Sequence, residues 1–273
     1  MRATGGFAAQ AGQIVLSARF WRGVVAIAVF VLIWETASRA GIVRAPAPSS
    51  VLVTFNDLMR DPSYWFSWYL STRRVFAGFL AAMLLGIPLG LSMAVSRTLY
   101  GIVFPVFEVL RPIPPLAWVP AAIIFWPTQE LSIMFVTFLG AFYTVVINVI
   151  DGAQTIDLRY YQAARSMGSS KWDIFRRIIL PGTVPSIVVG ATVGIGIAWA
   201  VVVAAEMISG GGSAGSMGGA KGGGLGFFIW NSYVGGSYTQ IVVGMISIGI
   251  AGYISSALLR KLGEIVTPWL REQ

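Results

Sequence analysis

Residues 131–150 read LSIMFVTFLGAFYTVVINVI, residues 151–181 read DGAQTIDLRYYQAARSMGSSKWDIFRRIILP, and residues 184–208 read VPSIVVGATVGIGIAWAVVVAAEMI. A helix needs about 20 mostly apolar residues to cross a bilayer. The first and third stretches meet this requirement, and Glu206 is their one charged residue. The pattern therefore predicts two membrane-spanning helices joined by a polar loop.

The composition of the whole chain supports a membrane location. Of its 273 residues, 56% are hydrophobic and 11% are charged, whereas soluble domains carry about 25% charged residues. Cysteine and histidine are absent. Their absence excludes disulfides, thiolate nucleophiles, Ser-His-Asp triads and zinc sites built on Cys or His. We therefore expect an integral membrane protein and no conventional enzyme. Nucleic-acid binding would predict a basic face with interleaved aromatic residues, and the sequence shows none.

Further apolar segments complete an all-α, polytopic fold. We expect a cytoplasmic N-terminal segment over residues 1–22 and a transmembrane domain over residues 23–273. The six predicted spans lie at about 23–39, 75–95, 102–126, 131–150, 184–208 and 240–259.

The distribution of basic residues predicts the orientation. With the N-terminus inside, the inner segments hold 12 Lys and Arg residues and the outer segments hold 6. The bias favours cytoplasmic N- and C-termini, although Arg73 and Arg74 are assigned to the outer side. The acidic residues near span ends, Glu35, Glu130 and Glu206, are expected to lie singly.

The loop at residues 151–181 is expected to be ordered. A first helix is predicted from about Asp157 to Met167, and Gly168 suits the left-handed residue that ends a helix. Ser170 and Asp173 have the spacing of an N-terminal capping pair, which places a second helix after them. We expect this second helix to end at Pro181.

The second loop helix is predicted to carry one apolar stripe, formed by Trp172, Phe175 and Ile179. Such a stripe serves either to dock a partner protein or to rest on lipid headgroups. The spacing and the turn at Gly168 favour docking.

The third predicted span contains several prolines, which remove backbone donors. Broken backbone at membrane depth is tolerated only inside protein or beside water. One interpretation is that this segment lines the translocation path or its gate; the alternative is a structural pair between Glu108 and Arg111. Glu206 has two interpretations: its side chain faces the same gate, or it reaches the membrane–water interface and is hydrated. The path or gate candidates are Arg111, Pro112, Pro114, Pro115, Trp118 and Glu206.

The loop also carries a recognisable motif. Gln162-Ala163-Ala164, three residues, Gly168, nine residues and Ile178-x-Leu180-Pro181 resemble the EAA loop of ABC-importer permeases, with Gln162 in place of Glu. The resemblance implies the type I ABC-importer permease fold and a loop that inserts into a cleft of an ATPase subunit. The implied coupling residues are Gln162, Ala163, Ala164, Gly168, Trp172, Phe175, Ile178, Leu180 and Pro181.

Other segments resemble the branch of this family that imports taurine, alkanesulfonates, nitrate or bicarbonate. They are residues 86–90, 111–118, 204–208, 225–230 and 267–269. The resemblance implies a small anionic substrate. We expect it to be attracted by the basic residues on the outer side, which are Arg39, Arg44, Arg60, Arg73 and Arg74. The glycine-rich extension at residues 210–223 has no assigned role.

The resemblance also implies the partners. These are ATP-binding cassette ATPase subunits, a second permease copy in a homodimer, a periplasmic or lipid-anchored substrate-binding protein, and the lipid bilayer of the bacterial inner membrane. This chain has no Walker A motif, so we expect no cofactor of its own, with ATP bound by the partner. The alternative is a secondary transporter or channel, which usually shows two related halves; no internal repeat is present.

Overall fold

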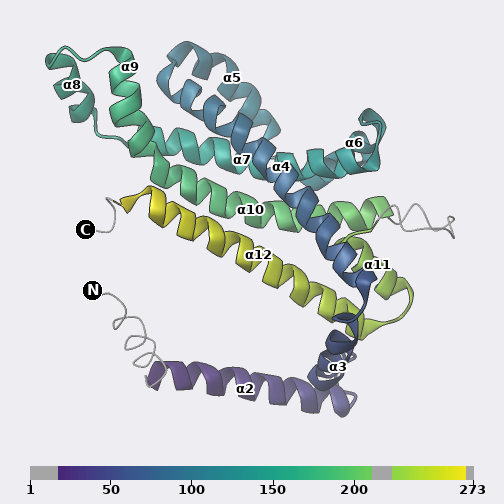
Figure 1. Cartoon of the computed structure of the whole chain (residues 1–273). Helices are drawn as coiled ribbons and strands as arrows, with labels where there is room; N and C mark the ends of the chain where they lie inside the picture. The colour runs from purple at the N-terminus through teal and green to yellow at the C-terminus, as the bar shows by residue number, and fades with distance from the viewer. Residues whose placement is uncertain (1–17, 211–222, 269–273) are drawn as a thin grey trace.

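The computed structural model describes residues 18–210 and 223–268, and every regular element in these ranges is a helix (Figure 1). The all-α prediction is confirmed. In chain order the elements are α2 (Ala18–Arg39), α3 (Pro48–Leu58), α4 (Pro62–Val95), α5 (Arg97–Leu110), η1 (Pro115–Trp118), α6 (Val119–Phe125), α7 (Gln129–Gln154), α8 (Leu158–Ser166), α9 (Lys171–Ile174), the π-helical η2 (Phe175–Ile179), α10 (Leu180–Gly210), α11 (Leu225–Val234) and α12 (Tyr238–Val266).

The number of membrane-crossing helices agrees with the predicted six if one broken span is counted. Five helices in the described part are long and apolar enough to cross a bilayer. The sixth is the pair Arg97–Leu110 and Pro115–Phe125, which is bent by 86°. The proline-rich segment between them therefore does break the span.

Helix α4 begins well before the predicted span at residues 75–95. Asp61 accepts a hydrogen bond from the backbone N–H of Ser63 at 2.8 Å, and Pro62 occupies the first turn. Both features stabilise a helix start. The helix then runs without interruption to Val95, so Arg73 and Arg74 lie within it and not in an outer loop.

The core is built where α7 packs between α4 and α10. Glycines on α4 allow the close approach, because a Cβ at Gly90 would lie 2.8 Å from the Cβ of Val149 on α7. A Cβ at Gly86 would lie 3.2 Å from Cγ1 of Val145. Small residues in membrane helices allow close packing of this kind.

The molecule has two distinct ends (Figure 1). Helices α8 and α9 form one, hereafter the hairpin end, and the start of α2 and the end of α12 lie on the same side. Helices α6 and α11 and the start of α4 lie at the opposite end. Helix α2 stands apart from the bundle, and its apolar segment Trp21–Arg39 is uncovered along its length.

Candidate functional site

The first candidate site is the hairpin, residues 157–181. Helix α8 is capped by Asp157, whose carboxylate accepts the N–H of Arg159 at 2.9 Å. It ends at Gly168, which has φ +77°. The N–H of Ser169 donates to the carbonyl of Ala164 at 3.0 Å, and that of Gly168 donates to Arg165 at 2.9 Å. This pair of bonds is the Schellman ending, so the predicted left-handed turn at Gly168 is confirmed.

Helix α9 begins with the predicted capping pair. The Ser170 hydroxyl oxygen accepts the N–H of Asp173 at 3.1 Å, and the same hydroxyl donates to the Asp173 carboxylate. An N-cap of this type stabilises a helix by about 1 kcal/mol. The start of the second loop helix is therefore fixed as the sequence predicts.

The expected end of this helix at Pro181 is wrong. Residues Lys171–Ser209 form one 39-residue helix that includes α9, η2 and most of α10. Pro181 has no N–H for a regular helical bond, and a wider π turn lies directly before it. There the N–H of Leu180 donates to the carbonyl of Phe175, five residues back. The π turn absorbs the irregularity that would otherwise end the helix.

The apolar stripe on the second helix is divided between the bundle and the solvent. Ile174 and Ile179 are each 6% exposed and pack with Leu91 and Ala153. Trp172 remains 66% exposed and stacks on the half-buried Phe175. The prediction that Ile179 belongs to a free docking stripe is therefore wrong.

The side chains that do project from the hairpin lie on α8 and the turn after it. Leu158 is 72% exposed, Tyr160 is 64% exposed and Met167 is 78% exposed. Sequence reasoning missed them, because their spacing forms no regular apolar stripe. Of the motif residues, Gln162, Ala163 and Gly168 are exposed, Ala164 is buried, and the last three are half-buried: Ile178, Leu180 and Pro181.

The broken third span places its candidate residues around the bend. Arg111, Pro112 and Pro114 are exposed, whereas Pro115 and Trp118 are half-buried in η1, which packs against α7 and α10. The ion pairs of the described residues do not include one between Glu108 and Arg111, so that alternative is wrong. The assignment of this segment to the translocation path stays a prediction.

The second candidate site is a buried charge cluster at the opposite end, hereafter the arginine cluster: Ser71, Arg74, Glu130 and Glu206. Nη1 of Arg74 lies 2.7 Å from Oε1 of Glu206. Nη2 of Arg74 pairs with Glu130, and its Nε donates to Oε2 of Glu130 at 3.1 Å. The Ser71 hydroxyl donates to the Glu206 carboxylate at 2.8 Å. Arg74 and Glu206 are each 1% exposed.

The arginine cluster also holds the start of α11. Arg74 donates to the carbonyl of Gly223, and the Glu206 carboxylate accepts the N–H of Gly226 at 2.9 Å. The N–H of Leu225 donates to the Ser71 hydroxyl oxygen at 2.8 Å. Helices α4, α7, α10 and α11 therefore meet at one set of charges, which fixes α11 against the bundle.

Three sequence-based expectations are wrong at this cluster. Glu206 does not hydrate at an interface, because its carboxylate is buried and paired. The acidic residues do not all lie singly, since Glu130 and Glu206 converge on Arg74. Arg74 is not free to attract an anion from outside, and Arg73 pairs with Glu130 at 2.8 Å. No signal in a single sequence links residues this far apart along the chain.

Replacing Gly224 with alanine tests how tightly the cluster is packed. Gly224 has φ +146°, and a Cβ there would lie 2.4 Å from the carboxyl carbon of Glu206. We expect G224A to lower stability by about 1 to 3 kcal/mol, measured as thermal unfolding in detergent. G196A is the matched control, because a Cβ at Gly196 has no neighbour within 4 Å. An equal melting temperature for the two variants would contradict the packing described here.

Comparison with known proteins identifies the class. Residues 86–272 match the family model described as the binding-protein-dependent transport system inner membrane component. The match covers more than half of the chain, and the chain belongs to this family. It is a multi-pass inner-membrane permease of an ABC importer, and as such a non-catalytic transport subunit.

Individual relatives place the chain within the family. It is 34% identical over 265 residues to a nitrate import permease of Synechocystis sp., with 94% of this chain and 92% of the relative covered. It is 29% identical to the taurine transport system permease of Escherichia coli, with 93% and 91% covered. The inward-facing MetNI methionine ABC transporter aligns with TM-score 0.61 at 22% identity, over 76% of this chain and 99% of that chain. This last likeness supports the fold alone.

Proposed function

We propose that this permease imports a small anion and is driven by an ATPase subunit that docks on the hairpin. The supporting observation is the continuous helix Lys171–Ser209. At 1.5 Å per residue it is about 58 Å long. It begins in the hairpin and carries Glu206 near its other end. A displacement of α9 by a partner would therefore reach the arginine cluster and α11 through one rigid element.

The proposed assembly contains two copies of this permease, two ATPase subunits and a substrate-binding protein. The hairpin end would face the cytoplasm, where the ATPase subunits lie, and α11 would face the binding protein. The exposed side chains Leu158, Tyr160 and Met167 supply the apolar contacts. Gln162 is exposed as well and offers hydrogen bonds in place of the ion pair that Glu would make.

The substrates named for the two relatives are nitrate and taurine. Nitrate is an oxyanion and taurine carries an anionic sulfonate group, so we propose a substrate with an anionic oxygen group. Arg74 is occupied by two carboxylates and does not suit a substrate contact. Arg111 is exposed at the bend of the third span and has no ion-pair partner among the described residues. An ionisable residue in a spanning segment is a functional candidate, so we assign Arg111 to the path.

The test is uptake by proteoliposomes that contain the permease with its own ATPase and binding protein. We expect ATP-driven uptake of labelled nitrate or taurine, and R111Q should lower the maximal rate about tenfold, as loss of one favourable charge contact of about 1.4 kcal/mol implies. R260Q changes an exposed arginine near the end of α12; it is the control and should leave the rate near wild type. An unchanged rate in R111Q would remove Arg111 from the path.

A further inference from the structure

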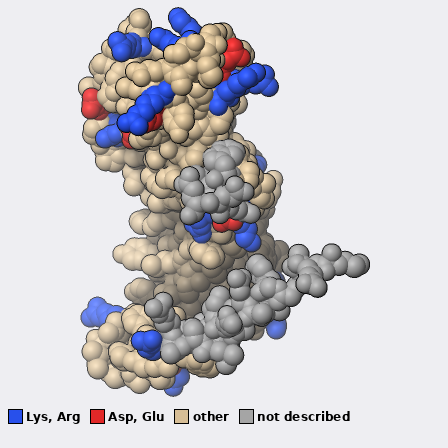
Figure 2. All heavy atoms as spheres, turned by 90° about the vertical axis from the view of Figure 1, so that its left-hand side faces the viewer, with Lys and Arg blue, Asp and Glu red and all other residues tan. Residues whose placement is uncertain are grey.

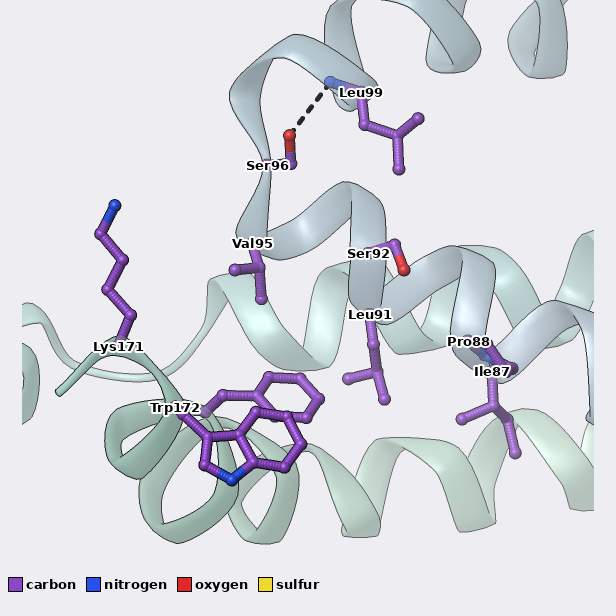
Figure 3. A pocket seen from close by; sticks show the side chains of 10 residues that line it. Ile87, Pro88, Leu91, Ser92, Val95, Ser96, Leu99, Lys171 and Trp172 are labelled. Carbon is purple, nitrogen blue, oxygen red and sulfur yellow. Dashed lines mark hydrogen bonds between the residues drawn. The ribbon is translucent and has the colours of Figure 1, made fainter.

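Two adjoining cavities lie at the hairpin end of the bundle. The first is a groove of about 770 Å³ between the end of α4 and the start of α9 (Figure 3). The second, of about 590 Å³, lies between the α4–α5 turn, the end of α7 and the hairpin. Val95 and Lys171 line both cavities, so the two adjoin at these residues.

The groove is mainly apolar. In Figure 3 the Trp172 ring lies across from Leu91 and Ile87, while Val95 stands above it and the Lys171 chain extends away from the rings. The polar residues are Ser92 of α4 and Ser96, which lies between α4 and α5. The Ser96 oxygen already accepts the N–H of Leu99 at 3.3 Å. This lining suits an apolar chain, because it gives a polar ligand few hydrogen-bond partners.

The second cavity is cationic. Arg97, Arg165 and Lys171 line it from three different segments, and no Asp or Glu lines either cavity. All three cations are exposed, and the ion pairs within residues 18–210 and 223–268 include none of them. Burial raises the pKa of the Tyr161 phenol in the same lining, which keeps it neutral. Figure 2, which faces this end of the molecule, shows Lys and Arg at its top with Asp and Glu among them.

We propose that these two cavities together bind one anionic phospholipid, with its phosphate among Arg97, Arg165 and Lys171 and an acyl chain in the groove beside Trp172. The charge pattern requires a ligand with net negative charge, and the adjoining groove requires an apolar tail. A free phosphate lacks the tail, and a zwitterionic lipid lacks the net charge. Basic pockets between membrane helices bind acidic headgroups in this way. Leu158 also lines the second cavity, so the proposed lipid site borders the surface on which we propose that the ATPase docks, but it does not depend on which substrate is transported.

The first test is native mass spectrometry of the full permease, purified with any subunits that accompany it, after addition of phosphatidylglycerol or phosphatidylcholine. We expect retention of phosphatidylglycerol, and a loss of tenfold or more in its affinity for the triple variant R97Q/R165Q/K171Q. The matched control R159Q/R176Q/R177Q removes three charges from the same hairpin outside both cavities, and it should bind as wild type. Equal retention of the two lipids, or equal loss in both variants, would overturn the proposal.

The second test separates a lipid from a free anion. S92W places a bulky ring in the groove and leaves the three cations in place, so it should weaken phosphatidylglycerol binding severalfold. Inorganic phosphate at millimolar concentration should not displace the lipid. If S92W binds lipid as wild type does, or if inorganic phosphate competes fully, the site accepts headgroup chemistry alone and the proposed lipid site is wrong. If a co-purifying ATPase subunit, and no lipid, is lost from the triple variant, the cations serve a protein contact instead.

Discussion

Replacement of Glu206 by glutamine is expected to be among the most destabilising single changes in this chain. The substitution leaves the buried Arg74 guanidinium with one carboxylate where it had two, and it puts an NH2 donor in place of one of the two Glu206 oxygens, which accept from Arg74 and from the N–H of Gly226. Breaking a buried ion pair by removing one partner costs about 3 to 5 kcal/mol. We expect E206Q to melt at a much lower temperature in detergent and to accumulate poorly in the membrane.

Two companion variants make this prediction specific. R73Q changes the neighbouring arginine, which binds the same Glu130 but is 44% exposed, and exposed pairs contribute about 0 to 1 kcal/mol. R74M/E206L removes both charges and leaves Glu130 to pair with Arg73. Replacing a complete buried pair by apolar residues is often close to neutral, so we expect the double variant to be more stable than E206Q. If E206Q and R73Q have the same melting temperature, the arginine cluster does not hold α11.

The second large effect is expected at the hairpin surface. L158D/M167D places two carboxylates where apolar side chains are 72% and 78% exposed. If both side chains are central to the contact with the ATPase, each substitution costs about 2 kcal/mol of binding, or roughly a thousandfold in affinity together. We expect the ATPase subunit to be absent when the variant permease is purified, while the melting temperature of the permease alone stays near wild type.

A matched control tests whether an added negative charge anywhere on the surface releases the ATPase subunit. V234D introduces a carboxylate at Val234, which is 69% exposed at the end of α11, on the side opposite to the hairpin (Figure 1). This variant should retain the ATPase subunit. Retention of the subunit by L158D/M167D as well would place the docking surface elsewhere.

Local signals in the sequence predicted much of the fold. Apolar length identified the helices, the prolines after Arg111 indicated the broken span, and Gly168 with Ser170 located the hairpin turn and the second helix start. The cap and turn signals depend on residues within about one helical turn, where geometry is fixed by the backbone itself, and apolar length depends on one continuous segment. The motif at Gln162 to Pro181 indicated the family for a similar reason, since its spacing is visible in one chain.

The remaining features depend on contacts between distant residues. Arg74 and Glu206 are separated by 132 positions, and nothing near either one indicates a partner. Sequence reasoning therefore assigned Arg74 to the outer side, where it would attract an anion, and left Glu206 either hydrated or at a gate. The continuation of the helix through Pro181 was missed because a proline normally ends a helix, and the compensating π turn before it has no local sequence signal. The inward orientation of the Ile179 side chain likewise depends on its packing against α4 and α7.

The most direct test of the account is the ATP dependence of uptake by proteoliposomes containing the permease, its ATPase and its binding protein. Wild type should accumulate the anion only with ATP, and L158D/M167D should show no ATP-driven uptake at any ATP concentration while remaining folded. The account would be contradicted if the permease alone moved the anion without ATP, as a secondary transporter or channel does, or if L158D/M167D were driven by ATP as fast as wild type.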